Sequence, residues 1–167
     1  MTHIIVGENA SGKTLWLRNY IDNIGHNKCN SNLDGLSNVR FNRDRLDVLG
    51  DLIESDIKVL GSSFIVPDTN DYRLSRRFFD LAAIICNDHD YLALDEPEQL
   101  LTITENLKIV QLLCQLSLKG LYKEMVIVTK EAAYFAIPDS KYYTVKMSDN
   151  NKVDRIEITE EDAYEFT

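Results

Sequence analysis

Long apolar runs are absent from this 167-residue chain, which predicts that no segment crosses a membrane as a helix. Cysteine is scarce as well: Cys29, Cys86 and Cys114 are widely spaced and show no metal-ligand spacing. Cys86 and Cys114 lie in apolar helical patterns, which are typical of reduced core residues. The chain enters an apolar run at Ile4 and leaves no room for a signal peptide, so we expect a cytoplasmic protein.

Basic residues are outnumbered, with 18 Lys and Arg against 27 Asp and Glu and a formal net charge of −9. This balance argues against a protein that coats nucleic acid nonspecifically. Two local basic segments remain, at residues 40–45 and 73–77. Each is either a patch for nucleic acid or a solvated helix end with ion pairs. Nucleic acid is therefore only a weakly indicated partner.

A phosphate-binding loop pattern, G-x-x-x-x-G-K-[ST], occupies Gly7-Glu8-Asn9-Ala10-Ser11-Gly12-Lys13-Thr14. An apolar run precedes it and a helical pattern follows it, which is the strand–loop–helix context that this motif requires. Glycines let successive backbone N–H groups face phosphate oxygens, and the helix presents its positive end to the same anion. Lys13 adds charge at the outer phosphates, and the Thr14 hydroxyl is a ligand for Mg²⁺. We therefore predict ATP binding through the loop and the next residue, Leu15.

A second, acidic motif ends an apolar run that reads Tyr91-Leu92-Ala93-Leu94-Asp95-Glu96. Such a run is typical of a buried parallel strand, and ligands of open α/β sheets bind at the carboxyl ends of strands. Asp95 is therefore expected beside the phosphate loop as a ligand of Mg²⁺, directly or through water. Glu96 is a candidate general base for an attacking water. The alternative is a strand end that meets a solvated acidic turn at Pro97.

The remaining periodicity predicts one α/β domain over residues 1–167. Strands are expected at 3–7, 57–60, 64–66, 91–95 and 125–128, with a hairpin at 142–147 and 153–158. Helices are expected at 13–24, 43–55, 74–87, 103–119 and 131–136, and after Thr159. Residues 26–38, rich in Asn, Ser and Gly, are expected to form a loop. The predicted fold class is a three-layer α/β P-loop NTPase with a mainly parallel sheet and a C-terminal β-hairpin.

The run Asp95-Glu96-Pro97-Glu98 resembles one branch of these proteins, the ATP-binding-cassette and SMC-like ATPases. Within them it is most similar to stand-alone ATPases and to the ATPase heads of overcoming-lysogenisation-defect nucleases. The resemblance implies a Walker A loop at 7–14, a Walker B strand at 92–95 and Glu96 as the catalytic base. It also implies a polar sensor at Lys130, where the family usually has His. A lysine there could contact the terminal phosphate, or it is a solvated residue at a strand end.

The family's signature segment, of Leu-Ser-Gly-Gly type, falls on Leu74-Ser75-Arg76-Arg77. The signature glycines are missing, and no glutamine precedes Gln99 where the family has a glutamine loop. We also expect no counterpart of the family's antiparallel strands before Walker A, or of their adenine-stacking aromatic. By resemblance, two subunits would sandwich two ATP molecules, and Ser75, Arg76 and Arg77 would contact the nucleotide of the other subunit. Arginine suits this role because its guanidinium binds phosphate bidentately.

The leading functional hypothesis is an Mg²⁺-dependent ATPase, slow on its own, whose ATP binding and hydrolysis drive or switch a partner protein. The partner is a second copy in an ATP-dependent dimer, or a different protein. One alternative is a nucleoside or nucleotide kinase in which residues 73–77 clamp a phosphate as a lid. Glu96 argues against it, because a glutamate there is better suited to activating water. The other alternative is a nucleotide-binding regulatory module with little turnover.

Overall fold

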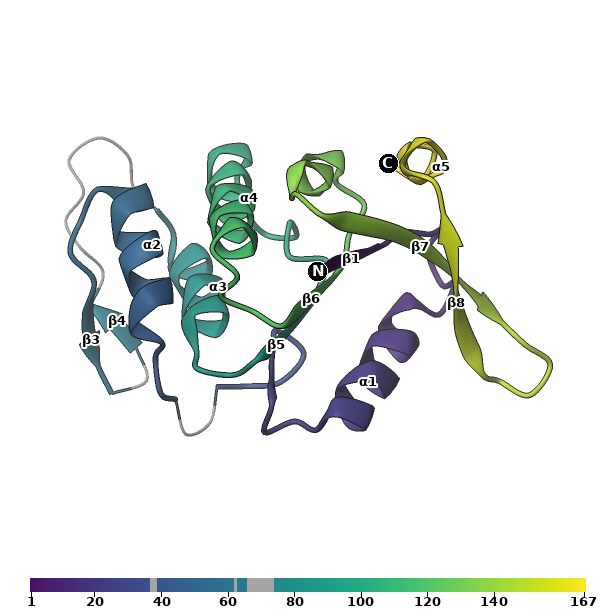
Figure 1. Ribbon diagram of the computed structural model, residues 1–167, viewed down its shortest axis with the longest axis horizontal. Coiled ribbons are helices and arrows are strands. Elements are labelled where there is room, and N and C mark those ends of the chain that lie inside the picture. Colours follow the sequence, from purple (N-terminus) through teal and green to yellow (C-terminus); the bar gives the residue numbers. More distant parts are fainter. Residues whose placement is uncertain (37–38, 62, 66–73) are drawn as a thin grey trace.

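A six-stranded sheet forms the centre of the computed structural model, which describes residues 1–36, 39–61, 63–65 and 74–167 (Figure 1). The strand order is β2-β5-β6-β1-β7-β8, and every neighbouring pair is parallel except β7 and β8. These strands are β1 (Thr2–Ile5), β2 (Cys29–Ser31), β5 (Tyr91–Asp95), β6 (Glu124–Val128), β7 (Ser140–Met147) and β8 (Val153–Ile158). The predicted mainly parallel sheet with a C-terminal hairpin is therefore confirmed.

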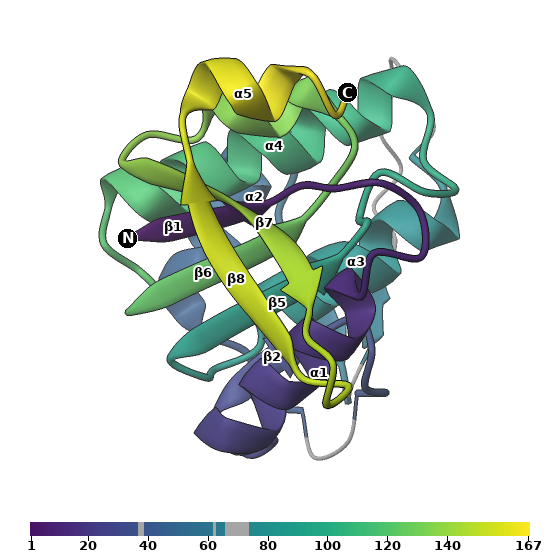
Figure 2. The same ribbon diagram turned by 90° about the vertical axis from the view of Figure 1, so that its right-hand side faces the viewer.

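Helices lie on both sides of this sheet, which gives three layers (Figures 1 and 2). On one side is α1 (Lys13–Ile24), whose buried Leu17 and Ile21 pack in one core with Val126 of β6. On the other side are α2 (Arg43–Ile53), α3 (Arg76–Cys86), α4 (Ile103–Leu118), the 3₁₀ helix η1 (Ala132–Ala136) and α5 (Glu160–Tyr164). The central strands β1, β5 and β6 each carry consecutive buried apolar residues, because helices cover both of their faces.

Polar side chains cap four helices at their N-termini. Asn42, Ser75, Thr102 and Thr159 each accept a hydrogen bond from a backbone N–H three residues further along. Helix α1 differs, because it follows Gly12, which has no side chain to offer. Its first N–H groups are therefore left for another acceptor, such as an anion.

The structure corrects several predicted boundaries. Strand β2 lies inside the predicted loop at 26–38, because tertiary contacts rather than local pattern hold it. Asn30 of β2 donates to the Asn87 carbonyl (2.6 Å) and to the Tyr122 hydroxyl (2.7 Å). Strand β1 ends at Ile5 rather than at residue 7, and residues 132–136 form a 3₁₀ helix. Helix α3 starts at Arg76 because the preceding serine is its cap.

Two predicted short strands form a separate antiparallel pair, β3 (Lys58–Leu60) and β4 (Ser63–Ile65). Val66 of the predicted strand 64–66 and Arg73 of the second basic segment lie outside the described residues. All three cysteines are free thiols, and burial raises the pKa of Cys29 and Cys86 to about 12. Among the described helices, none is long and apolar enough to cross a membrane.

Candidate functional site

The carboxyl ends of β1, β5 and β6 meet at one edge of the sheet, because the three strands are parallel neighbours. Ile5 ends β1 and Asp95 ends β5, and both pair with Val128 at the end of β6. Backbone bonds continue past the strands: the Thr129 N–H donates to Ile5 O (3.1 Å), and the Glu96 N–H donates to Val128 O (2.7 Å). The predicted phosphate loop, the acid pair and the segment after β6 are therefore brought side by side.

A hollow of about 330 Å³ lies over the predicted phosphate loop. Residues 9–15 line it, together with Asp95, Glu96 and Met147 of β7. A larger hollow of about 660 Å³ lies beside β2, but none of the predicted site residues lines it. The smaller hollow is the candidate site, because the lysine, the hydroxyl and the two carboxylates converge there.

Two glycines shape this loop. Gly12 has a φ of 97°, in the left-handed region that favours glycine. A Cβ at Gly12 would also lie 3.3 Å from side-chain atoms of Met147 and Val153, so the β7–β8 hairpin packs directly on the loop. A Cβ at Gly7 would lie 3.0 Å from Ser11 Oγ. The tight curl that the motif predicts is therefore present, and the hairpin supports it.

Lys13 reaches back along this curl. Its side-chain Nζ donates to Gly7 O (2.8 Å), Glu8 O (2.5 Å) and Ser11 Oγ (3.4 Å). Lys13 is only 7% exposed, and burial lowers the pKa of its ammonium, with the charge of nearby Lys130 acting in the same direction. A poorly solvated ammonium is stabilised electrostatically by an anion that enters the hollow.

Thr14 and Asp95, the two residues that the sequence predicts as ligands of Mg²⁺, are in direct contact. The Thr14 hydroxyl donates to Asp95 Oδ2 at 2.9 Å. The other carboxylate oxygen, Oδ1, is buried and has no hydrogen-bond partner among the described residues. Burial raises the pKa of Asp95. A hydroxyl beside a desolvated, half-unpaired carboxylate fits a hard divalent cation such as Mg²⁺, which takes oxygen ligands and offsets the cost of burial.

Asn32 is a site residue that the sequence does not reveal. It follows β2, and its side chain bonds twice to the backbone of Asp95: Nδ2 donates to Asp95 O (2.8 Å), and Oδ1 accepts from Asp95 N (2.8 Å). These two bonds fix the strand end that presents the carboxylate. A single Asn in a polar segment gives no signal of this role, because the pairing depends on β2 lying next to β5.

Glu96 lies at the mouth of the hollow, next to Lys130. Its φ of 44° turns the chain sharply after the strand. Its Oε2 accepts from Gln99 Nε2 (2.6 Å), and its Oε1 lies 3.5 Å from Lys130 Nζ. Lys130 Nζ also donates to Asn9 Oδ1 in the phosphate loop. The lysine is therefore neither free nor remote: it joins the loop to the acid.

Residues 75–77 do not join this site within one chain, since none of them lines the hollow. The Ser75 N–H donates to Glu105 Oε2 (2.6 Å), and Arg76 pairs with Asp80 (3.0 Å). In the other basic segment, Arg45 is 3% exposed, so it is neither a solvated helix end nor part of a surface patch. Within one chain, therefore, the structure does not place residues 75–77 at the predicted phosphate loop.

The sheet order, the helices on both faces and the hollow at the strand ends are the features to compare with known proteins. No protein-family model and no curated protein matches this sequence. Solved structures do match. An archaeal ribosome recycling factor in complex with the archaeal ribosomal stalk protein superposes with a TM-score of 0.61 at 14% identity, over 97% of this chain and 35% of that chain.

A second similar structure is a dimeric ATP-binding cassette in a post-hydrolysis state, bound to ADP and Pi. It has a TM-score of 0.55 and 16% identity, over 95% of this chain and 85% of that chain. An RNase-L inhibitor matches with a TM-score of 0.61 at 14% identity, over 97% of this chain and 35% of that chain. The chain thus spans about a third of the length of the recycling factor and the inhibitor. At this identity the likeness shows the fold alone, a mixed α/β fold that the chain shares with an ATP-binding cassette.

Proposed function

We propose that this chain binds ATP with Mg²⁺, hydrolyses it slowly, and uses the change to switch a partner protein. The observation that carries the proposal is the contact between Thr14 and Asp95 at 2.9 Å beside the buried Lys13. It joins two motifs that are 81 residues apart in the sequence, in the arrangement that P-loop NTPases use.

Phosphate binding is assigned to residues 7–15. The uncapped N-terminus of α1 offers N–H groups and a positive dipole end. Lys13 supplies a charge whose present partners are neutral oxygen atoms, so an arriving phosphate is a stronger acceptor than those it replaces. Thr14 and Asp95 would hold the cation, which supplies charge neutralisation for the phosphates when bound.

Glu96 is proposed as the general base. Its carboxylate is 22% exposed, so it can meet a water molecule at the mouth of the hollow. It would accept a proton from that water as the water attacks the terminal phosphate. Lys130 is proposed to contact the same phosphate, because its ammonium already lies between Glu96 and Asn9.

The partner is proposed to bind at the open side of the site. Leu100 and Ile103, which follow the Glu96 turn, are 71% and 82% exposed, and such apolar exposure near a site is typical of an interface. We propose an ATP-dependent homodimer in which residues 75–77 reach the other subunit's nucleotide, with a different protein as the second candidate.

The acidic run 95–98 supports a relationship to the ATPase heads of overcoming-lysogenisation-defect nucleases. We also propose that residues 1–167 act as one cytoplasmic domain.

The kinase alternative has less support. A phosphate-clamping lid needs guanidinium groups over the hollow of its own chain, whereas neither Arg76 nor Arg77 lines it. A regulatory module without turnover would keep the loop and the cation pair and would not use Glu96. The ATPase and the regulatory module therefore differ in whether Glu96 takes part.

Calorimetry with ATP and Mg²⁺, followed by phosphate-release assays, tests the proposal. Lys13→Ala should weaken ATP binding by about tenfold to a hundredfold, the loss expected for a charge-assisted hydrogen bond. Glu96→Gln should bind ATP like wild type and release no phosphate, because an amide cannot accept the proton. Lys28→Ala is a matched control, since this exposed lysine lies beyond the far end of α1. Unchanged ATP affinity in a folded Lys13→Ala protein would refute nucleotide binding at this loop.

A further inference from the structure

Glu98 is a partly buried carboxylate to which the proposed reaction gives no role. Its Oε1 accepts two hydrogen bonds, from Thr129 Oγ1 (2.7 Å) and from the Lys130 backbone N–H (2.8 Å). Its Oε2 is buried and has no hydrogen-bond partner in the described part of the chain. Burial raises the pKa of this carboxyl group. Burying a carboxylate in this way costs desolvation free energy, and a contact between neutral groups would hold the two loops together without that cost.

The segment that Glu98 holds follows β6 and is itself tied to the end of β1. Thr129 is fully buried, its N–H donates to Ile5 O (3.1 Å), and its hydroxyl accepts from the Glu131 N–H (3.0 Å). Glu98 adds a bond from the loop after β5, so three loops are joined at one point. The main chain of Lys130 is thereby fixed relative to both the phosphate loop and the acid pair.

The position of the Lys130 ammonium depends on how firmly the Lys130 backbone is held. The side chain is 40% exposed, yet its ammonium bonds to Asn9 and lies 3.5 Å from Glu96 Oε1. A long side chain with four rotatable bonds keeps its charge in one place only if its backbone is held. The bond from the Lys130 N–H to Glu98 couples the backbone of Lys130 itself to the loop that follows Glu96.

We propose that Glu98 is a positioning residue that holds the Lys130 backbone so that the lysine ammonium reaches the terminal phosphate of ATP. The proposal rests on the proposed function of the hollow. In this role Glu98 supports Lys130 as the residue that senses the terminal phosphate. The turn at Glu96 and the side chain of Lys130 would then respond to that phosphate together.

A positioning role and a purely electrostatic role of Glu98 predict that different variants retain function. Glu98→Gln removes the charge and keeps an oxygen that can accept the Lys130 N–H. Glu98→Asp keeps the charge and shortens the side chain by about 1.5 Å, which takes the carboxylate out of reach. If Glu98 positions Lys130, the glutamine variant should behave like wild type and the aspartate variant like Glu98→Ala.

The readout is the ratio of ATP affinity to ADP affinity, measured by calorimetry with Mg²⁺, because only ATP has the terminal phosphate. Lys130→Ala should lower this ratio about tenfold, the loss of one charge-assisted hydrogen bond. Glu98→Ala and Glu98→Asp should lower it at least about threefold, and the variant that carries both Glu98→Ala and Lys130→Ala should match Lys130→Ala alone. Additive losses, a loss with glutamine equal to that with alanine, or an unchanged ratio in Glu98→Ala would each overturn the proposal.

Glu105→Ala is the matched control for a merely structural effect. Glu105 is also a buried carboxylate that holds two backbone N–H groups, those of Ser75 (2.6 Å) and Thr102 (3.0 Å), but it does not contact Lys130. Measured on monomeric protein, this variant should melt at a lower temperature and keep the wild-type affinity ratio, because Ser75 does not line the hollow of its own chain. An equal fall in the ratio would show that loss of stability alone explains the Glu98 result.

Amide hydrogen exchange separates this proposal from the proposed function. In nucleotide-free protein the Lys130 N–H should exchange slowly in wild type and Glu98→Gln, and at least about tenfold faster in Glu98→Ala and Glu98→Asp. A protein that binds neither nucleotide would refute the proposed function, and the exchange rates would still decide whether Glu98 holds Lys130. Equal rates in all four proteins would overturn the proposal even if ATP binds.

Discussion

Replacing Arg45 by leucine should lower the free energy of unfolding by about 3 to 5 kcal/mol, the range seen when one partner of a buried charged network is removed. Arg45 is 3% exposed, and its guanidinium binds carbonyl groups rather than a surface acid. Nε and Nη2 donate to Leu121 O (3.1 and 2.5 Å), Nη2 donates to His89 O (2.8 Å), and Nη1 donates to Asn87 O. These carbonyls lie after α3 and α4, so one side chain of α2 ties three helices together.

The magnitude follows from the groups left behind. Leu121 O and His89 O would each lose a charged donor, at about 1 to 3 kcal/mol apiece. Asn87 O would keep the bond from Asn30 (2.6 Å). The stacking of the guanidinium over the Tyr122 ring, 3.6 Å from its centroid, adds about 2 kcal/mol. Burial of the leucine side chain offsets about 1.5 to 3 kcal/mol of this sum.

Urea unfolding, followed by circular dichroism and by Trp16 fluorescence, measures the difference. Arg43→Leu is the control, because Arg43 is exposed on the same helix and should change the free energy by less than about 0.5 kcal/mol. If Arg45→Leu also stays within about 1 kcal/mol of wild type, the carbonyl network does not stabilise the fold as argued here.

Thr14→Ala and Asp95→Asn should each remove most of the Mg²⁺ dependence of ATP affinity, and calorimetry that finds the dependence unchanged in both would refute the cation site. Glu96→Gln should be a dimer with ATP and a monomer without it, and adding Arg76→Ala and Arg77→Ala should abolish the shift. A Glu96→Gln protein that stays monomeric by light scattering at saturating ATP would exclude the homodimer. Burial raises the pKa of Asp95 above its ordinary value of 3.8, so the nucleotide-free protein should gain stability as the pH falls through the raised value. Asp95→Asn should lack this gain in urea titrations between neutral and acidic pH, and parallel profiles for the two proteins would contradict the assignment.

Motifs that are contiguous in the chain could be predicted from the sequence. The curl from Gly7 to Thr14 and the acid pair at the end of β5 need particular residue types at fixed spacing, so the pattern itself carries the geometry. The apolar strands and the hairpin were predictable for the same reason, since burial on both faces or on one gives a local pattern.

Polar elements held by distant contacts were not predictable. Strand β2 reads as a loop, because Cys29–Ser31 has no apolar pattern and is held through Asn30 to Asn87 and Tyr122. Some helices are a residue or two shorter than predicted, because the predicted range included a residue that caps the helix. Ser75 is an example: it lies in the predicted helix 74–87 but is the N-cap of α3. The basic segment 40–45 reads as a surface, yet the structure buries Arg45.

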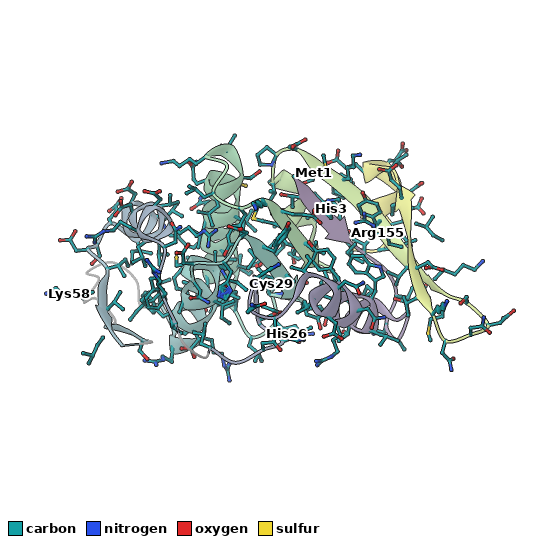
Figure 3. The ribbon with its side chains drawn as sticks, turned by 60° about the horizontal axis from the view of Figure 1, so that its bottom comes forward. Met1, His3, His26, Cys29, Lys58 and Arg155 are labelled. Carbon is teal, nitrogen blue, oxygen red and sulfur yellow. The ribbon has the colours of Figure 1, made fainter. Side chains whose placement is uncertain are left out.

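The hairpin shows the same division between local pattern and tertiary packing. Alternation predicts β7 and β8, but only the structure brings Arg155 of β8 next to His3 of β1 (Figure 3), with Nη1 and Nδ1 3.0 Å apart. Likewise, only packing seats Met147 and Val153 against Gly12, which makes the hairpin a wall of the candidate site.

The sequence by itself determined the fold class and the residue types that line the candidate site, because the loop pattern at 7–14 and the acid pair at 95–96 are local patterns. The tertiary structure alone decided how these residues are held. Asn32 binds the backbone of Asp95 from 63 positions away, and Glu98 binds Thr129 from 31 positions away. Hydrogen bonds between such distant residues leave no periodic trace in the sequence, since they exist only after the parallel strands have brought their carboxyl ends together.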